Sequence, residues 1–118
     1  AKVSAFIREM GSAYASADFV IARAGASTCC ELCLLGKPAL LIPLPEAKRD
    51  HQHLNAAALM RGGGVDEGIQ GELSGRSVMR FLQKKMKSPE KLAAMGAALK
   101  AMAVPDAAAR VADVMEAV

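Results

Sequence analysis

The residues best suited to chemistry form a turn of small side chains that ends in a carboxylate. This segment, Arg23-Ala24-Gly25-Ala26-Ser27-Thr28-Cys29-Cys30-Glu31, follows an apolar run and opens an expected helix. Small side chains let a ligand approach bare backbone N–H groups, and the helix N-terminus adds a partial positive charge. We therefore predict phosphate binding at the turn, by Gly25, Ala26, Ser27 and Thr28.

Glu31 has two interpretations that its spacing leaves open. In the first, Thr28-x-x-Glu31 is a capping box, in which the Glu31 N–H donates to the Thr28 side chain while the Glu31 carboxylate accepts from the Thr28 N–H. In the second, the carboxylate accepts hydrogen bonds from both hydroxyls of a ribose, and bonds of this kind are worth roughly 1.5–3 kcal/mol each. Spacing alone slightly favours the capping box.

A second polar segment, Pro43 to Asn55, follows another apolar run. Ligands of open α/β sheets bind at the carboxyl ends of strands, which is where this segment lies. His51 and Gln52 offer directional donors and acceptors for sugar hydroxyls. An equally supported alternative is that Asp50 caps the next helix and that the residues after it are merely an exposed first turn. We predict no metal site, because His51 and His53 diverge around a helix and no third ligand can be assigned.

The cysteines and Ser27 in this region do not indicate a catalytic site. Cys29, Cys30 and Cys33 are an odd set crowded into one short stretch, which is not a disulfide framework and fits a reducing compartment. Cys30 and Cys33 form a C-x-x-C, but with no second C-x-x-C in the chain we expect these two to be buried small apolar positions rather than a redox or zinc site. Ser27 lies in no G-x-S-x-G elbow, so hydrolase chemistry is not predicted.

Two apolar runs supply the scaffold that would bring these segments together. Phe19–Ala22 and Ala39–Pro43 are continuous rather than alternating, which indicates strands buried on both faces. Each leads to a helix, the second near Gln52–Arg61, after which Gly62–Gly64 is a flexible stop and a short strand around Val65 follows. This order predicts an α/β fold, a Rossmann-like parallel sheet with flanking helices.

The two ends of the chain are expected to be mainly helical. Val3–Phe6 reads as a further short strand that feeds a helix over Glu9–Ser16. From Ser74 onward the apolar residues recur every three or four positions. Helix starts are expected at Ser88-Pro89 and at Pro105-Asp106.

Composition narrows the classes of function. A chain of 118 residues that is 53% apolar is enough for one domain or part of one. The absence of Trp, with one Tyr and three Phe, argues against nucleic-acid stacking. The net charge is +3, and the basic run from Lys84 to Lys91 favours a solvated helix face over an anionic membrane or phosphate patch. No run approaches the roughly 18 uncharged apolar residues of a membrane span, and we see no signal peptide, so a cytosolic protein is predicted.

Four motifs in register resemble those of the MurG-type UDP-N-acetylglucosamine:lipid I N-acetylglucosaminyltransferases, which complete the peptidoglycan precursor. The Gly-x-x-Thr-x-x-Glu turn alone recurs among nucleotide-sugar transferases, whereas four motifs across nearly the whole chain are specific. They are Val3-x-x-Phe6-Ile7-x-x-Met10 with Tyr14-Ala15-x-Ala17-Asp18; Arg23-x-Gly25-Ala26-x-Thr28-x-x-Glu31 with Gly36-x-Pro38-Ala39; Asp50-His51-Gln52-x-x-Asn55-Ala56; and Val104-Pro105-Asp106-Ala107 with Arg110-Val111-Ala112.

The resemblance implies the second half of a GT-B C-terminal donor-binding domain, which binds UDP-GlcNAc. It places the diphosphate at residues 25–28 and the ribose at Glu31, and so favours the ligand interpretation of that carboxylate. It implies no required cofactor or metal, and no catalytic residue within this portion. The remaining implied contacts are the uracil with Phe6 and Ile7, and the sugar with His51, Gln52 and Asn55.

Residues 1–118 are thus expected to form a partial UDP-sugar-binding domain of an inverting hexosyltransferase that moves GlcNAc to lipid I and forms lipid II. The resemblance puts the acceptor site, the general base and a membrane-associating surface in an N-terminal domain outside this sequence. We expect this portion alone to be inactive and to self-associate through an exposed sheet edge, and the intact enzyme to lie at the inner face of the plasma membrane. The alternatives are a donor-binding subunit of another nucleotide-sugar transferase and a non-catalytic nucleotide-sugar-binding or interaction module.

Overall fold

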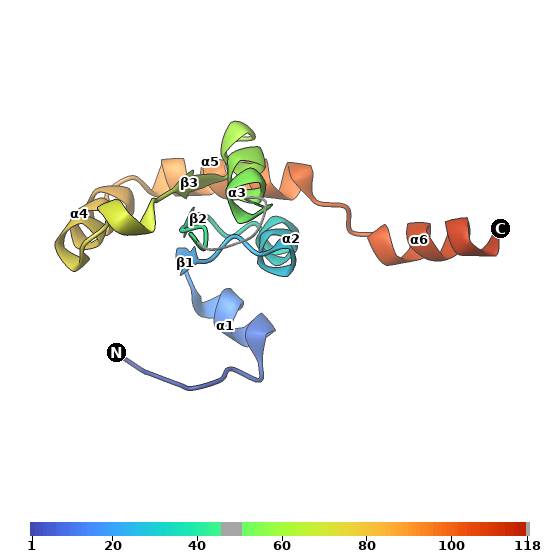
Figure 1. Cartoon of the computed structure of the whole chain (residues 1–118), viewed down its shortest axis with the longest axis horizontal. Helices are drawn as coiled ribbons and strands as arrows, with labels where there is room; N and C mark the ends of the chain where they lie inside the picture. Colours follow the sequence, from blue (N-terminus) through green and yellow to red (C-terminus); the bar gives the residue numbers. More distant parts are fainter. Residues whose placement is uncertain (46–50, 118) are drawn as a thin grey trace.

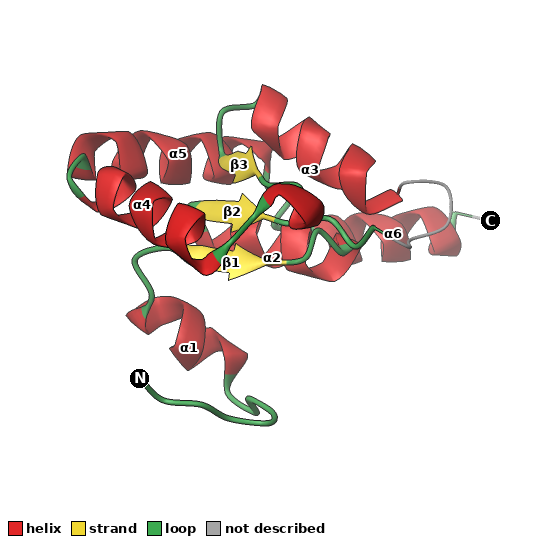
Figure 2. Ribbon diagram, turned by 60° about the vertical axis from the view of Figure 1, so that its left-hand side comes forward, coloured by secondary structure: helices red, strands yellow, loops and turns green. Residues whose placement is uncertain are grey.

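Three short parallel strands form the centre of the molecule in the computed structural model, which describes residues 1–45 and 51–117. They are β1 (Val20–Ala22), β2 (Ala39–Leu41) and β3 (Val65–Glu67), in the spatial order β1-β2-β3. The strands pair in register, first residue with first residue, so their carboxyl ends meet at one edge of the sheet (Figure 2). The strands predicted from the two apolar runs and the short third strand are confirmed. The expected burial on both faces holds for β2 but is wrong for β1, in which Ile21 is 42% exposed.

Two crossover helices connect the strands and close the core. α2 (Ala26–Leu35) joins β1 to β2, and α3 (His51–Arg61) joins β2 to β3. α2 packs against α3 and against α5 (Pro89–Met102). Three leucines from α2, β2 and α5 are completely buried there, and each stabilises the fold by roughly 1.5–3 kcal/mol relative to an exposed side chain. They are Leu32, Leu41 and Leu99.

A contact between two glycines sets how closely α2 and α5 approach. Gly36 ends α2 in the left-handed region, with φ at 61°, which a residue with a side chain rarely adopts. Gly96 lies opposite on α5, and a Cβ added there would lie 2.6 Å from the carbonyl oxygen of Gly36. A side chain at position 96 would therefore push the two helices apart.

α4 (Gly75–Met86) follows β3 and a short 3-10 turn, η2 (Gln70–Glu72), and packs against α5. Its N-terminus is fixed by a capping box of two serines. The Ser77 N–H donates to Ser74 Oγ at 3.1 Å, and the Ser74 N–H donates to Ser77 Oγ at 2.9 Å. The helix expected from Ser74 onward is thus confirmed, as is the start of α5 after Ser88.

The first and last helices extend away from the central layers (Figure 1). α1 (Met10–Ser16) buries Tyr14 alone, and α6 (Ala107–Glu116) buries none of its residues. The expected strand at Val3–Phe6 is wrong: residues 3–6 form no regular element, because no strand among the described residues lies beside them to complete a backbone ladder.

By length and composition, Pro89–Glu116 is a segment able to cross a membrane, with a mean hydropathy of 1.2. The segment includes Lys100 and Asp106, so it is not the uncharged apolar run of about 18 residues that the sequence was found to lack. The segment divides into α5 and α6 around Pro105, and α5 buries Met95, Gly96 and Leu99 against the rest of the molecule. α5 therefore packs as a core helix, and α6 is a separate helix that follows it.

Candidate functional site

The candidate site is built at the carboxyl edge of the sheet. β1 ends at Ala22 and β2 at Leu41, and because the strands are parallel, the segments that follow them leave the same edge. The Arg23 guanidinium reinforces this proximity, since its Nη1 donates to the carbonyl oxygens of Ile42 at 3.2 Å and Pro43 at 3.4 Å. The two polar segments singled out in the sequence therefore adjoin each other.

The first turn of α2 presents backbone donors at this edge. Gly25 is the N-cap, and the first bond of the helix runs from the Cys29 N–H to the Gly25 carbonyl at 3.0 Å. The amides of Ala26, Ser27 and Thr28 precede that bond and so have no partner within the helix. A Cβ on Gly25 would meet no atom of the described residues within 4 Å, so the space beside the N-cap residue itself is open. The turn has the geometry of an anion site.

Glu31 does not take part in a capping box, so that interpretation is wrong. The helix begins at Ala26 rather than after Thr28, which places Glu31 in its second turn, too far along the helix to reach the N-cap amide. Its Oε2 instead accepts a hydrogen bond of 2.8 Å from the hydroxyl of Tyr14 on α1. Among the described residues, Glu31 Oε1 has no hydrogen-bond partner and remains available to a ligand.

The hydroxyl of Tyr14 stays protonated over the whole physiological range. Burial first, and then the hydrogen bond to Glu31 and the negative charge of that carboxylate, raise the pKa of Tyr14 to about 12. A phenol that keeps its proton remains a donor, so it fixes one oxygen of the carboxylate. Sequence reasoning included Tyr14 in a family motif and missed this contact, because the two residues lie 17 positions apart.

Gln52 and Asn55 tie α3 to the two loops at the strand ends. Gln52 Oε1 accepts from the Leu44 N–H at 2.8 Å and from the Ala24 N–H at 3.3 Å. Asn55 Nδ2 donates to the carbonyl oxygen of Ala24 at 2.9 Å. Neither bridge was expected from the sequence, which offered these side chains only as sugar ligands. Since Gln52 Oε1 is occupied, the Nε2 group is the part of its amide left for a ligand.

The two histidines of α3 have different surroundings. His51 is exposed in the first turn, while His53 Nδ1 lies 2.7 Å from Glu67 Oε1 at the end of β3. Asp50, which was considered as the cap of this helix, and the preceding Glu46–Arg49 lie outside the described residues. Within residues 1–45 and 51–117 no group of three or more potential metal ligands is present.

Phe6 and Ile7 lie in the segment before α1. Phe6 is 79% exposed and Ile7 is 46% exposed, and both line a hollow of about 780 Å³ formed with residues of α1. The described hydrogen bonds join neither residue to α2 or α3. The structure therefore places these two candidates on a different segment from the edge where the others gather.

The cysteines have no sign of a reactive site. Cys33 is buried, as expected, and Cys29 is buried too. Burial, followed by the neighbouring thiols, raises the pKa of Cys29 to about 11 and also raises that of Cys33. Cys30 is exposed, so the expectation that it is a buried apolar position is wrong. The cause is the turn of the helix, which points residue 30 away from the face that packs on the sheet.

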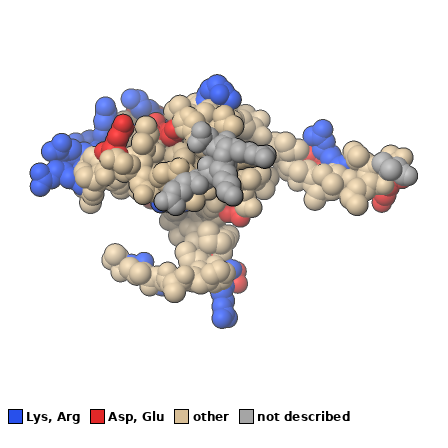
Figure 3. Space-filling view, in the orientation of Figure 1, with Lys and Arg blue, Asp and Glu red and all other residues tan. Residues whose placement is uncertain are grey.

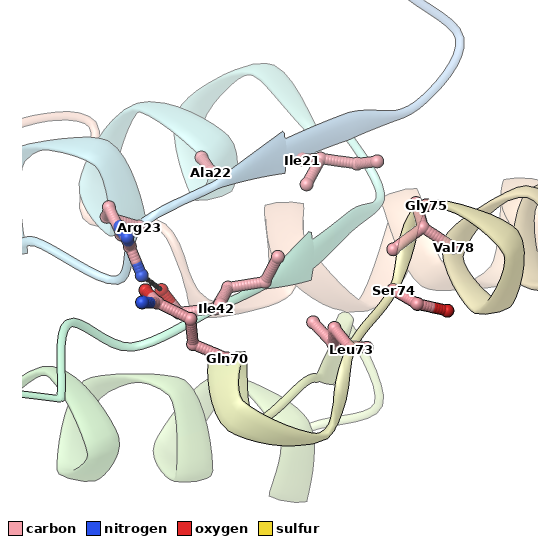
Figure 4. A pocket seen from close by; sticks show the side chains of 9 residues that line it. All are labelled: Ile21, Ala22, Arg23, Ile42, Gln70, Leu73, Ser74, Gly75 and Val78. Atoms are coloured by element: carbon pink, nitrogen blue, oxygen red, sulfur yellow. Dashed lines mark hydrogen bonds between the residues drawn. The ribbon is translucent and has the colours of Figure 1, made fainter.

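A separate, largely apolar pocket of about 500 Å³ lies beside β1 and β2, where η2 and the start of α4 approach them. Ile42, Leu73 and Val78 contribute apolar walls, and Arg23 and Gln70 lie together at one end (Figure 4). None of the sugar or phosphate candidates lines this pocket. Its Arg23, however, also holds the loop that follows β2, so one end of the pocket borders the candidate site.

Comparison with known proteins identifies the same family as the four sequence motifs. The model of the glycosyltransferase family 28 C-terminal domain matches residues 1–111. Relatives from Gloeobacter violaceus and Chelativorans sp. are 45% and 44% identical over 97% and 100% of this chain, and each is named a UDP-N-acetylglucosamine--N-acetylmuramyl-(pentapeptide) pyrophosphoryl-undecaprenol N-acetylglucosamine transferase. The chain covers 32% of each, so it spans about a third of the length of these curated relatives.

The fold comparison extends the agreement to three dimensions. The crystal structure of MurG from Acinetobacter baumannii superposes with a TM-score of 0.89 and 32% identity, over 99% of this chain and 35% of that one. The similarity drawn from the four motifs and the Rossmann-like parallel sheet are therefore confirmed. With a family model matched over nearly its whole length, this chain belongs to the glycosyltransferase family 28 C-terminal domains.

Proposed function

We propose that this chain binds UDP-GlcNAc as the donor-binding part of an enzyme that transfers GlcNAc to a lipid-linked muramyl pentapeptide. The observation that carries the proposal is the presence, on one helix, of first-turn amides without a side-chain cap and of a carboxylate that Tyr14 holds in place. The names of the relatives supply the identity of the donor sugar and of the acceptor.

The spacing along α2 suits a nucleoside diphosphate. Residues 26–28 and Glu31 are three to five positions apart, which at 1.5 Å per residue is roughly 5–8 Å along the helix axis. In a nucleotide the diphosphate and the ribose are joined through a single methylene, so they occupy neighbouring positions at this scale. We assign the diphosphate to the amides at Gly25, Ala26, Ser27 and Thr28, and the ribose hydroxyls to Glu31 Oε1.

The sugar lies, in this proposal, against the first turn of α3. Gln52 has its Oε1 fixed by two backbone amides, so its Nε2 is oriented as a donor toward a sugar hydroxyl. His51 is exposed beside it. Asn55 acts mainly through its bond to Ala24, which holds the loop before the phosphate turn. The uracil is assigned to the backbone of Phe6 and Ile7.

The contribution of this chain to the reaction is electrostatic. The acceptor hydroxyl oxygen forms a bond to the anomeric carbon while the bond from that carbon to the diphosphate breaks, and the hydroxyl proton passes to a base. Negative charge then grows on the departing UDP, where the amides and dipole of α2 stabilise it. We assign the base to no residue of this chain.

The acceptor also indicates where the enzyme works. The relatives are named for a pyrophosphoryl-undecaprenol acceptor, and an undecaprenyl chain partitions into a bilayer. We propose that the complete protein meets its acceptor at the cytoplasmic face of the membrane, with this chain supplying the donor.

Titration calorimetry of the chain with UDP and with UDP-GlcNAc tests the proposal. Glu31→Ala removes hydrogen bonds to the ribose, which both ligands share, so both affinities should fall by about 10- to 100-fold. Glu72→Ala removes the same charge from the exposed η2 turn and should leave both affinities unchanged. Equal effects of the two substitutions would overturn the assignment of Glu31.

Gln52→Glu separates the structural role of this residue from its ligand role. The glutamate keeps an oxygen for the amides of Ala24 and Leu44, and it replaces the Nε2 donor by a second oxygen. The affinity for UDP-GlcNAc should therefore fall more than the affinity for UDP, which lacks the sugar. A parallel loss for both ligands would show that Gln52 does not contact the sugar.

A further inference from the structure

The first helix meets the body of the molecule through one buried side chain. α1 and the residues before it project from the central layers as a separate lobe (Figure 3). Tyr14 is the one residue of α1 that is buried, and it is 6% exposed. Its hydroxyl donates to Glu31 Oε2 at 2.8 Å, and no other hydrogen bond among the described residues joins residues 1–16 to α2. The position of α1 and the orientation of the Glu31 carboxylate are therefore linked.

The same hydrogen bond decides which oxygen of Glu31 faces a ligand. The side chain of a glutamate has three rotatable bonds, and a half-buried one without a partner samples several rotamers. Tyr14 removes that freedom, because burial and the carboxylate raise its pKa to about 12 and the hydroxyl therefore remains a donor at neutral pH. The other oxygen, Oε1, has no hydrogen-bond partner among the described residues and is left in one orientation.

A carboxylate that is oriented before binding contributes more to affinity than one that binding has to order. Immobilising a side chain with many rotamers lowers affinity by about 2- to 10-fold, and a hydrogen bond already present in the free protein avoids that loss. The Tyr14 hydroxyl has one proton, which it donates to Oε2, so it has no donor left for a nucleotide. The effect of this hydroxyl on nucleotide binding therefore passes through Glu31.

We propose that Tyr14 is a positioning residue, which holds the Glu31 carboxylate in the orientation that accepts hydrogen bonds from the ribose hydroxyls. The inference rests on the proposed function, in which Glu31 binds the ribose, and it adds a residue that determines how strongly the chain prefers a nucleotide with a ribose diol. A ligand without the 2′- and 3′-hydroxyls gains nothing from the orientation of Oε1. Tyr14 therefore increases the affinity for UDP but not the affinity for 2′,3′-dideoxy-UDP.

A second hydrogen bond separates positioning of the carboxylate from simple attachment of α1. If Tyr14 only attached α1, its loss would weaken UDP and the dideoxy ligand alike, because both carry the uracil that is assigned to the segment before α1. Lys37 also holds this part of the chain, since its Nζ donates to the carbonyl oxygen of Ala17, directly after α1, at 2.9 Å. This bond does not involve Glu31. Lys37→Met is therefore a control that loosens the end of α1 and leaves the carboxylate in place.

Titration calorimetry of the chain with UDP and with 2′,3′-dideoxy-UDP tests the inference. Wild type should prefer UDP by about 10- to 100-fold, because the dideoxy ligand lacks the hydrogen bonds to the carboxylate. Tyr14→Phe keeps the ring and removes the hydroxyl, so the affinity for UDP should fall by about 2- to 10-fold while the affinity for the dideoxy ligand stays the same. Lys37→Met should retain the wild-type preference. Circular dichroism of every variant confirms that it is folded.

A double substitution shows whether Tyr14 acts through Glu31. Glu31→Ala removes the carboxylate, so adding Tyr14→Phe to it should cause no further loss of affinity for UDP. An unchanged preference in Tyr14→Phe, or a further loss in the double variant, would overturn the role of Tyr14. If Glu31→Ala alone still weakens UDP, the proposed function survives that outcome. If Glu31→Ala leaves UDP binding unchanged, the assignment of the ribose and the role of Tyr14 are both refuted.

Discussion

Replacing Tyr14 by Phe removes one hydroxyl from the contact between α1 and α2. The ring is 6% exposed, and Phe preserves its packing, so the change isolates the hydrogen bond of 2.8 Å to Glu31 Oε2. Bonds to charged groups contribute about 1.5–3 kcal/mol. Glu31 is half-buried, and water replaces part of the lost bond. We therefore expect Tyr14→Phe to lower the free energy of unfolding by about 1–2 kcal/mol.

The pH dependence of the free energy of unfolding gives a second way to examine the contact between Tyr14 and Glu31. Burial and the contact with Glu31 raise the pKa of Tyr14 from 10.0, its value in the unfolded chain, to about 12. Because the folded state holds the proton more tightly, this stabilisation is complete below pH 10 and is lost as the pH rises through 12. The full difference corresponds to roughly 3 kcal/mol, and because burial of the phenolate is its largest cause, the contact with Glu31 accounts for only part of it. Solvent near the hydroxyl screens the charge of Glu31 and reduces the contribution to about 1–2 kcal/mol.

Urea unfolding followed by circular dichroism measures both effects. Wild type should exceed Tyr14→Phe in stability at neutral pH, and the difference should shrink as the pH approaches about 11. All other ionisable groups are the same in both proteins, so their contributions cancel in the comparison. A double-mutant cycle with Glu31→Gln should give a coupling of about 1 kcal/mol. Additive effects together with a constant difference across pH would refute the contact as a source of stability.

Two further predictions concern the packing of α2. Gly96→Ala brings a Cβ within 2.6 Å of the Gly36 carbonyl oxygen and should lower the free energy of unfolding by about 1–3 kcal/mol in urea, whereas Gly11→Ala meets no atom within 4 Å and should be neutral or slightly stabilising. Cys30 is exposed while burial raises the pKa of Cys29 to about 11, so a thiol reagent at neutral pH should modify Cys30 first, and equal rates for both would contradict this arrangement.

Two strands of the sheet, β1 and β2, were predictable because each is indicated by an apolar run within a few consecutive residues. β1 and β2 coincide with the two continuous apolar runs, and β2 is buried at each of its three positions. The same reasoning failed for Val3–Phe6, which has strand-like composition but no partner strand beside it. A strand depends on hydrogen bonds from a neighbour, and that information is absent from the short window in which an apolar run is recognised.

The error in predicting the role of Glu31 at the candidate site has a similar cause. The phosphate turn was recognised from small residues before a helix, but the first residue of that helix was not, because Gly25 and Thr28 are both acceptable N-caps. An error of three residues in the helix start was enough to convert Glu31 from a side chain facing Tyr14 into half of a capping box. Tyr14, whose hydroxyl binds the Glu31 carboxylate, lies on another helix, α1, so the sequence around Glu31 does not reveal the contact.

Gln52 shows why residue type and spacing gave an incomplete account of the sugar candidates. The two polar atoms of its side-chain amide have different roles. Oε1 accepts hydrogen bonds from the backbone N–H groups of Ala24 and Leu44, while Nε2 is left for a ligand. A side chain with one polar atom could not do both. Binding and the positioning of the phosphate turn are consequently joined in one residue, so an alanine substitution at position 52 would disturb both at once. The oxygen and the nitrogen of this amide have to be tested separately, which is what Gln52→Glu achieves.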